Sequence, residues 1–222
     1  MNCTSEILYR ELLPQDIPAL ERLIRTTWQY DRFCSADTAG RLAAAYLGSC
    51  LASHTFSIVA EQDGSPIGVI LGRNARIHRR SWALRRRALQ TSVRLLASAE
   101  GRRVCRIFGC VQKIDRQLLK AAHRDYAGEV ALFAVSPECR GRGVGRRLFT
   151  LLKQEMLRQG VRDLFLFTDT SCNYGFYEHQ GMTRRCEKHH IFSIGGQRAA
   201  MRFFLYDLPL TGAGGVQAAR SR

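Results

Sequence analysis

The most constraining feature of the sequence is a pair of apolar runs separated by a glycine-rich loop and a helical repeat. Residues 129–135 form a nearly continuous apolar run, as expected for a strand covered on both faces. After the loop, apolar residues recur at helical spacing from Val144 to Met156, and Gly160 ends this stretch. Residues 163–168 read as a second buried strand. Such a β-loop-α-β crossover places its two strands parallel and side by side.

Further strands and helices are predicted on both sides of the crossover. The firmest is a β-hairpin, because Asp63-Gly64 lies between two apolar runs and is typical of a tight turn. A helix starting near Gln15 carries apolar residues at helical spacing. The other expected elements are a strand at 7–9, helices near 38–51, 82–99, 115–124 and 174–180, and strands near 183–192 and 200–206.

The loop from Ser136 to Phe149 carries three glycines and four arginines and allows three interpretations. It could hold a phosphate group, bind nucleic acid as an arginine-glycine segment, or be a flexible turn with a solvated basic rim. Glycine lets the backbone approach an anion, and a helix start adds free N–H groups. The loop lacks the Gly-Lys-Ser/Thr of a P-loop and the glycine spacing of a dinucleotide-binding fold. It is also not repetitive, as an arginine-glycine segment would be.

Two motifs in this region resemble those of the GNAT superfamily of N-acetyltransferases. Arg140-Gly-Arg-Gly-Val-Gly145 resembles the acetyl-CoA-binding motif Arg/Gln-x-x-Gly-x-Gly/Ala of that superfamily. Asn173-Tyr-Gly-Phe-Tyr-Glu-His-Gln-Gly-Met182 resembles its second hallmark, an Asn after the next strand and a Tyr one turn into the following helix. The two motifs stand in the expected elements and at the expected distance.

The resemblance implies an α/β (α+β) fold. Its central sheet would be mixed and mostly antiparallel, with six or seven strands, a splayed pair of parallel strands and flanking helices. One domain would span residues 1–210, with a basic helical insertion at about 73–125. Residues 211–222 have no periodicity and little to bury, and are expected to form a disordered tail.

The resemblance also implies the residues that bind the cosubstrate acetyl-CoA. Backbone amides from Arg140 to Gly145 would hold the pyrophosphate of coenzyme A, and the main chain of residues 133–135 would pair with the pantetheine arm. The full set of expected binding residues is Phe133, Ala134, Val135, Arg140, Gly141, Arg142, Gly143, Val144, Gly145, Arg146, Asn173 and Tyr177.

Acetyl transfer to an amine requires a base for the ammonium and an acid for the departing thiolate. Glu129 stands where many members of the superfamily place a catalytic glutamate, and partial burial there would raise its pKa. The alternative is a solvated glutamate at a strand edge. Tyr177 matches the tyrosine that protonates the thiolate in the superfamily, and Tyr174 is its rival. For either tyrosine the alternative is a packed aromatic ring.

Other polar residues near these motifs allow weaker hypotheses. Asn173 is expected to cap the short helix and to contact the cofactor arm. Cys172 invites a covalent acetyl-enzyme, but the sequence places no base beside it, and the superfamily transfers directly in a ternary complex. Cys186, His189 and His190 match no standard zinc spacing, so no metal is expected.

The basicity of the chain is concentrated in one segment. Residues 73–124 hold fifteen Lys or Arg and two acidic residues, Glu100 and Asp115, so most of the formal charge of +15 lies there. These arginines could be a solvated helical cover, or could attract an acidic peptide, RNA or an anionic membrane. The second function considered is therefore a binding module that keeps the fold and uses this segment on RNA or an acidic partner.

The remaining sequence features set the expected cellular context. Eight scattered cysteines without a Cys-x-x-Cys pair suit reduced thiols in the cytoplasm. No signal peptide is visible at the start of the sequence, and the uncharged stretch 42–60 is too interrupted by polar residues for a membrane span. A homodimer through the C-terminal strands is a further expectation. The acceptor is expected to be a primary amine, small or peptidic.

Overall fold

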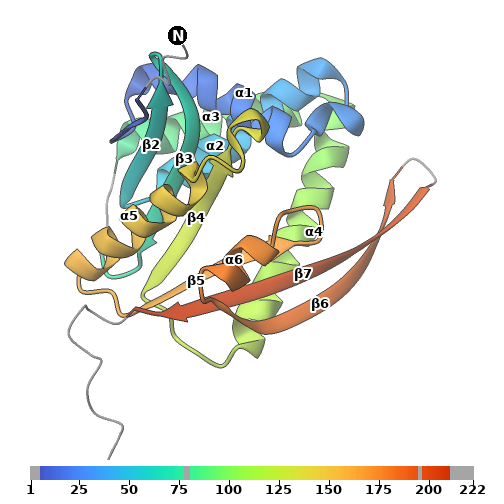
Figure 1. Ribbon diagram of the computed structural model, residues 1–222. Coiled ribbons are helices and arrows are strands. Elements are labelled where there is room, and N and C mark those ends of the chain that lie inside the picture. Colours follow the sequence, from blue (N-terminus) through green and yellow to red (C-terminus); the bar gives the residue numbers. More distant parts are fainter. Residues whose placement is uncertain (1–5, 78–80, 195–196, 211–222) are drawn as a thin grey trace, which may run out of the picture.

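The computed structural model describes residues 6–77, 81–194 and 197–210, and the predicted tail lies outside these residues. One seven-stranded mixed sheet organises the described chain, with strand order β1-β2-β3-β4-β5-β7-β6 (Figure 1). Of the strand pairs formed by the described residues, β4–β5 alone is parallel. The strands are β1 Leu8–Arg10, β2 Phe56–Gln62, β3 Ser65–Asn74, β4 Gly128–Val135, β5 Asp163–Asp169, β6 Thr183–Ile194 and β7 Gln197–Pro209. The predicted fold class is confirmed.

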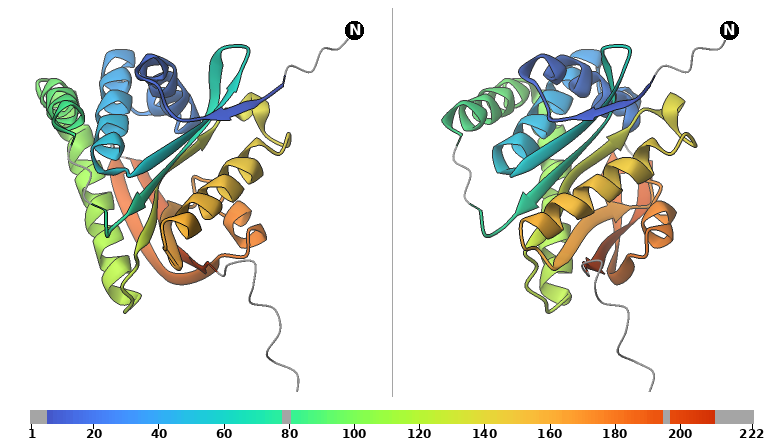
Figure 2. Two further views of the ribbon diagram at one scale, coloured as in Figure 1. Left: turned by 90° about the vertical axis from the view of Figure 1, so that its left-hand side faces the viewer. Right: turned by 60° about the vertical axis from the view of Figure 1, so that its left-hand side comes forward.

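Helices cover both faces of the sheet (Figure 2). On one face α1 and α2 pack on β2, β3 and β4, while α4 packs on the half formed by β5, β6 and β7. On the other face α5 and α6 share one hydrophobic cluster with the sheet. The helices are α1 Ile17–Thr27, α2 Ala36–Ser53, α3 Trp82–Leu96, α4 Ala99–Ala121, α5 Val144–Arg158 and α6 Gly175–His179.

The predicted hairpin and crossover are confirmed. Asp63 and Gly64 both have positive φ, 51° and 73°, which is the backbone geometry of a type I′ turn. The crossover helix α5 is anchored by the apolar repeat seen in the sequence, and residues such as Leu148, Leu152 and Met156 are fully buried. Gly160, with a φ of 74°, ends this helix as predicted.

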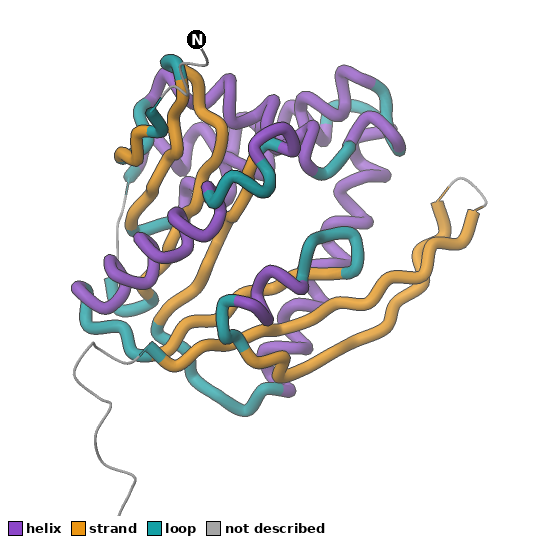
Figure 3. Tube along the Cα trace, in the orientation of Figure 1, coloured by secondary structure: helices purple, strands orange, loops and turns teal. Residues whose placement is uncertain are grey.

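The parallel strands β4 and β5 separate soon after they begin. They pair only at Gly128 with Leu164 and at Glu129 with Phe165. The register between β3 and β4 also shifts, because Gly72 pairs with Val130 and the next pair in β3 reaches Leu132. This bulge bends β4 away from β5, and the two strands diverge toward the loop before α5 (Figure 3).

The arginine-rich segment differs from its prediction. A single helix, α4, runs from Ala99 to Ala121, whereas the sequence pattern indicated a helix only from residue 115. The Ser98 hydroxyl accepts a hydrogen bond from the Gly101 N–H at 2.9 Å and caps α4. A Cβ at Gly101 would lie 1.8 Å from the Leu95 carbonyl oxygen, so the tight turn from α3 into α4 requires glycine. The sequence pattern hid this start because only Gly101 and Val104 are buried in the first turns.

Candidate active site

The glycine-rich loop presents free backbone donors at the start of α5. Gly141 and Gly143 have φ values of 77° and 79°, a conformation that other residues rarely adopt. The first backbone bond of the helix runs from the Arg147 N–H to the Gly143 carbonyl. Within the described chain, no N–H from residue 141 to 146 donates to a protein acceptor. These donors, together with the positive end of a 15-residue helix, form a site suited to an anion such as a phosphate.

Arginine side chains surround this loop. Arg140, Arg142 and Arg146 are all exposed. Arg142 donates from Nη1 to the Gln62 side-chain oxygen at 3.0 Å, which orients it over the end of β2. Arg140 and Arg146 have no ion pair among the described residues, so their charge is available to an anionic ligand.

The loop lies directly beside the point where β4 and β5 diverge. Phe133, Ala134 and Val135 pair with β3 on one side and have no partner in β5 on the other. A Cβ at Gly145 would lie 3.4 Å from the Phe133 ring, so the start of α5 is packed against this free edge of β4. The structure therefore brings together the predicted binding residues of β4 and of the loop. An extended ligand with an anionic end fits this arrangement.

Tyr177 of α6 lies among aromatic rings with its hydroxyl unpartnered. Its ring centroid is 5.5 Å from Phe176, 6.1 Å from Tyr206 and 6.4 Å from both Phe133 and Phe149. The Tyr177 hydroxyl makes no hydrogen bond to any described residue. Burial, with Cys172 and Asp169 nearby, raises the pKa of Tyr177 well above its ordinary value. The phenol therefore stays protonated at neutral pH and is able to donate a proton.

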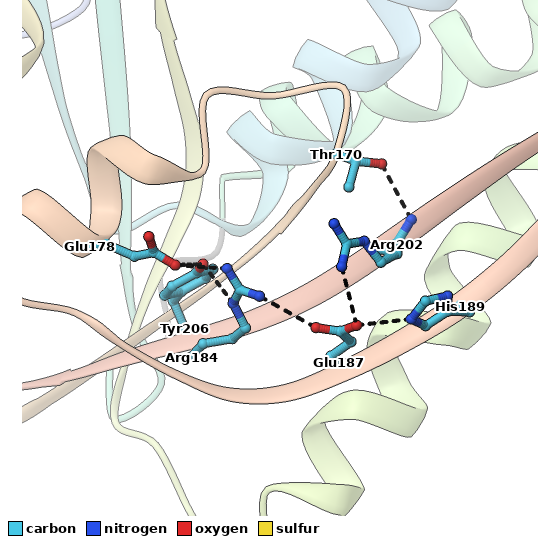
Figure 4. Close-up of polar contacts among 7 residues, drawn as sticks. All are labelled: Thr170, Glu178, Arg184, Glu187, His189, Arg202 and Tyr206. Atoms are coloured by element: carbon cyan, nitrogen blue, oxygen red, sulfur yellow. Dashed lines mark hydrogen bonds and ion pairs between the residues drawn. The ribbon is translucent and has the colours of Figure 1, made fainter.

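Arg184 of β6 fixes α6 to the sheet (Figure 4). Its Nε donates to the Tyr206 hydroxyl at 2.9 Å, and its Nη2 lies 2.7 Å from Glu178 of α6. The guanidinium also lies over the Phe204 and Tyr174 rings, 4.4 and 5.4 Å from their centroids. The Tyr206 hydroxyl donates to Glu178 at 2.7 Å and closes the network. These contacts hold the helix that carries Tyr177.

The residues before α6 are placed differently from the prediction. Asn173 does not cap the helix through its side chain, because Tyr174 is the N-cap residue and no side-chain cap bond forms. The Asn173 backbone carbonyl instead accepts from the Phe176 N–H at 3.2 Å. The Tyr174 ring packs on Phe204, 5.1 Å between centroids, so its position is that of a packed aromatic residue.

Glu129 lies on the face of β4 that is covered by α4. Its carboxylate accepts from Arg73 Nη1 at 3.0 Å, and the side chain is 23% exposed. It borders an open cleft of about 500 Å³ between the end of α4 and the start of β4, together with Arg73, Lys120, Arg124 and Tyr126.

Asp115 of α4 is a candidate residue that the sequence reasoning missed. It is the one acidic side chain, among those described, that is not exposed and yet has neither an ion pair nor a hydrogen bond. Burial is the main cause that raises the pKa of Asp115 to about 7, and the nearby negative charges of Asp169 and Glu129 add to it. A carboxyl group that titrates near neutrality is suited to general-base chemistry. The available signal was that Asp115 is one of only two acids in the segment 73–124.

Aromatic residues that follow α1 or lie in α2 are close to Cys172. Trp28 and Tyr46 meet edge to face at 5.6 Å between centroids. Burial raises the pKa of Tyr46, Tyr30 and Cys172, and Cys50 and Cys172 act on both tyrosines. A raised pKa keeps the Cys172 thiol protonated, so it is a poor nucleophile. The acidic and aromatic groups suit an organic cation.

The described residues contain no group of three or more His, Cys, Asp or Glu arranged to hold a metal ion. Cys186, His189 and His190 lie on β6, where His190 Nε2 is 3.3 Å from the Cys110 sulfur and His189 Nε2 is 2.8 Å from Glu187. None of the described helices combines the length and apolar character of a membrane span.

A family model described as the acetyltransferase (GNAT) family matches residues 17–182. Among solved structures, an N-acetyltransferase from Staphylococcus aureus is 15% identical, with a TM-score of 0.56 over 93% of this chain and 100% of that one. The Salmonella typhimurium protein yncA, solved with its cofactor acetyl-CoA, is 15% identical, with a TM-score of 0.54 over 97% and 100%. A ribosomal-protein alanine N-acetyltransferase from Escherichia coli is 14% identical, with a TM-score of 0.53 over 96% and 100%. At these identities the structures share a fold, and a search of curated proteins by sequence found no match.

Proposed function

Because the chain belongs to the acetyltransferase (GNAT) family, we propose that it transfers the acetyl group of acetyl-CoA to a primary amine. The observation that carries this proposal is the continuity of two features: the free N–H groups of residues 141–146 and the unpaired edge of β4 at residues 133–135. The first is suited to a pyrophosphate and the second to the amide groups of a pantetheine arm. Arg140, Arg142 and Arg146 add positive charge, and Asn173 is exposed in the loop between β5 and α6.

The chemical step is direct attack of the amine on the thioester in a ternary complex. The amine nitrogen forms a bond to the acetyl carbon, and the bond between that carbon and the sulfur breaks. Tyr177, whose raised pKa keeps its hydroxyl protonated at neutral pH, gives its phenolic proton to the departing thiolate. The proton that the acetylated nitrogen then loses restores the phenol of Tyr177. The high pKa of Cys172 supports direct transfer over an acetyl-cysteine intermediate.

A carboxylate must take the proton from the incoming ammonium group, whose ordinary pKa is about 10.4 if it resembles lysine. Glu129 and Asp115 are the two candidates, and both lie on the same face of the sheet. Asp115 has no counter-ion among the described residues, and an ammonium group would give it one. Glu129 already has an ion-pair partner in Arg73. We assign the first proton transfer to Asp115, with Glu129 orienting the cation or relaying the proton through water.

A binding module without catalysis is the second candidate function. It would use the basic segment and would not require a protonated tyrosine beside the divergence of β4 and β5. The geometry around Tyr177 favours the enzyme.

The proposal is tested by calorimetric titration of the protein with acetyl-CoA. Gly143→Val is the test variant and Gly160→Val its control, because the two glycines have similar φ values, 79° and 74°, and open space at Cβ. We expect Gly143→Val to weaken binding about tenfold or more, because the new side chain strains the loop and covers its N–H groups. Gly160→Val, at the far end of the same helix, should bind like the wild type. Equal affinities for the two variants, or no binding by the folded wild type, would contradict the proposed cofactor site.

A further inference from the structure

The outer face of α3 carries a row of exposed apolar side chains. Trp82, Leu89, Val93 and Leu96 are 78%, 65%, 57% and 44% exposed. They follow one another at intervals of seven, four and three residues, so on an α-helix they form a single stripe. Together they account for half of the large apolar residues that the described chain exposes. Large side chains of this kind seldom gather on a solvated face.

The opposite face of α3 is already used by the core. Thr91 and Leu95 are buried, and Leu84 packs against the cluster below α2. A Cβ at Gly48 of α2 would lie 3.0 Å from the Thr91 hydroxyl and 3.3 Å from the Ala88 Cα, so the two helices are in close contact. Figure 2 shows α3 on the outside of the molecule, beyond α2 from the sheet. The apolar stripe on α3 therefore lies on the face that does not pack against the protein's own core.

Positive charge borders the stripe and negative charge is absent from α3. At 100° per residue, Arg85 and Arg86 fall on either side of the Trp82–Leu89 line. Neither arginine has an ion pair within the described chain. At the far end Arg102 donates to the carbonyl of Leu96, which places another cation beside the last residue of the stripe. An apolar stripe with a tryptophan and flanking arginines is the pattern of a helix that lies in a membrane interface.

We propose that the outer face of α3 docks the protein on the surface of an anionic lipid bilayer. Trp82, Leu89, Val93 and Leu96 enter the boundary between head groups and acyl chains, while Arg85 and Arg86 contact anionic head groups. Charge argues against a second copy of the chain, since pairing two stripes would bring four unpaired arginines together. RNA would engage the arginines and Trp82 but offers nothing to bury the three aliphatic residues. The proposal is independent of the acetyl-transfer reaction.

The test uses vesicles of phosphatidylcholine alone and of phosphatidylcholine mixed with phosphatidylserine. The chain has two tryptophans, so the Trp28→Phe variant makes Trp82 the sole fluorescent reporter. We expect a blue shift of Trp82 emission and co-sedimentation with the serine-containing vesicles only. Leu89→Ser/Val93→Ser should weaken that binding about tenfold or more, and Arg85→Gln/Arg86→Gln should do the same.

The matched control is Leu8→Ser/Ile191→Ser, which removes two equally exposed apolar residues, both 55% exposed, from other elements. It should sediment with the vesicles like the wild type. Equal binding by the stripe variant and the wild type, or no binding to either vesicle, would overturn the proposal. So would self-association or RNA binding that depends on Leu89 and Val93 while vesicle binding does not.

Discussion

Asp115 is a half-buried carboxylate with no counter-ion in the part of the chain that the structure describes, although the formal charge of the chain is +15. The chain has many arginines that could pair with an acid, and most of the other described acidic residues do have an ion pair. An unsatisfied charged group costs folding energy, and such costs concentrate at functional sites. The same carboxylate therefore lowers the stability of the protein and serves the reaction that we propose.

Asp115→Asn is expected to lower kcat and raise stability at the same time. Removing the base should reduce kcat roughly a hundredfold and abolish a fall in rate below about pH 7. Folding raises the pKa of Asp115 from the ordinary aspartate value to about 7, so the folded protein holds this proton more tightly than the unfolded chain does. Stability therefore falls as pH rises from about 4 to about 7, and the full loss is present above pH 7. The variant should therefore melt on the order of 5 °C higher than the wild type at pH 8 and show no such gain near pH 4.

Two further substitutions separate the roles of the carboxylates. Asp125→Asn changes an exposed acid that has no ion pair within the described chain, and it should leave both rate and melting temperature unaltered. Glu129→Gln should lower kcat about tenfold or more and keep the inflection near pH 7. If Glu129→Gln removes that inflection and Asp115→Asn keeps it, the assignment of the base to Asp115 is wrong.

Tyr177→Phe is expected to lower kcat roughly a hundredfold with little effect on the affinity for acetyl-CoA. The ring contacts with Phe176 and Tyr206 persist in phenylalanine, and only the hydroxyl is lost. Tyr174→Phe is the control, because that ring packs on Phe204 and should tolerate the change. Steady-state rates and calorimetric affinities for both variants check the prediction. Full turnover by Tyr177→Phe would make Tyr177 a packing residue.

The sequence offered Tyr177 and the loop at 140–145 as candidates but not Asp115, and the reason is physical. The loop and the tyrosine lie in short motifs whose spacing is fixed within one turn or one helix. Asp115 becomes unusual only through Asp169 and Glu129, which other elements bring beside it. The proximity of these three acids arises only in the folded chain and cannot be read from their separation in sequence. The arginines around Asp115 in the sequence also suggested a solvated helix.

At the scale of elements, α6 has five residues and depends on its neighbours for its position. Isolated helices of this length are not stable in water. Arg184 supplies the connection, with hydrogen bonds to Tyr206 and Glu178 and aromatic rings around the guanidinium. Lysine cannot reproduce the planar, forked contact.

Arg184→Lys is expected to lower the melting temperature by roughly 5 °C. It should also lower kcat more than it changes the KM for acetyl-CoA, because α6 carries Tyr177. Arg202→Lys on β7 is the control, since Arg202 shares Glu187 at 3.8 Å but touches neither Tyr206 nor Glu178. Calorimetric melting and steady-state kinetics distinguish the two. A loss of stability without any change in kcat would mean that Arg184 does not position Tyr177.

Elements with clear periodicity were predictable, and those set by contacts were not. The repeat through Leu148, Leu152 and Met156 fixed α5, and Asp63-Gly64 fixed the hairpin. The beginning of α4 depends instead on Gly101 fitting against the Leu95 carbonyl, a contact between two helices. The divergence of β4 and β5 was expected from the family resemblance alone.

At the scale of the whole molecule, the net charge should make stability depend on salt. Like charges on α3 and α4 repel one another in the folded state, and added salt screens them over about 10 Å at 0.1 M ionic strength. We expect the melting temperature to rise as sodium chloride is added at constant pH. Arg85→Glu/Arg86→Glu should reduce this dependence. A melting temperature that falls with salt would show that attractive ion pairs dominate.

The sheet ends in an open edge at β6, and the side chains along that strand bear on aggregation. Arg184, Arg185, Glu187 and Lys188 place charges along its first half, next to the body of the protein. Charged side chains on an exposed edge discourage a foreign strand from adding to the sheet. From His189 to Phe192 the edge carries no Lys, Arg, Asp or Glu, and Ile191 is 55% exposed. A foreign strand would therefore add to the sheet most readily along the outer half of β6. A charge introduced at Ile191 should reduce inclusion-body formation on overexpression more than a charge introduced in the first half of β6.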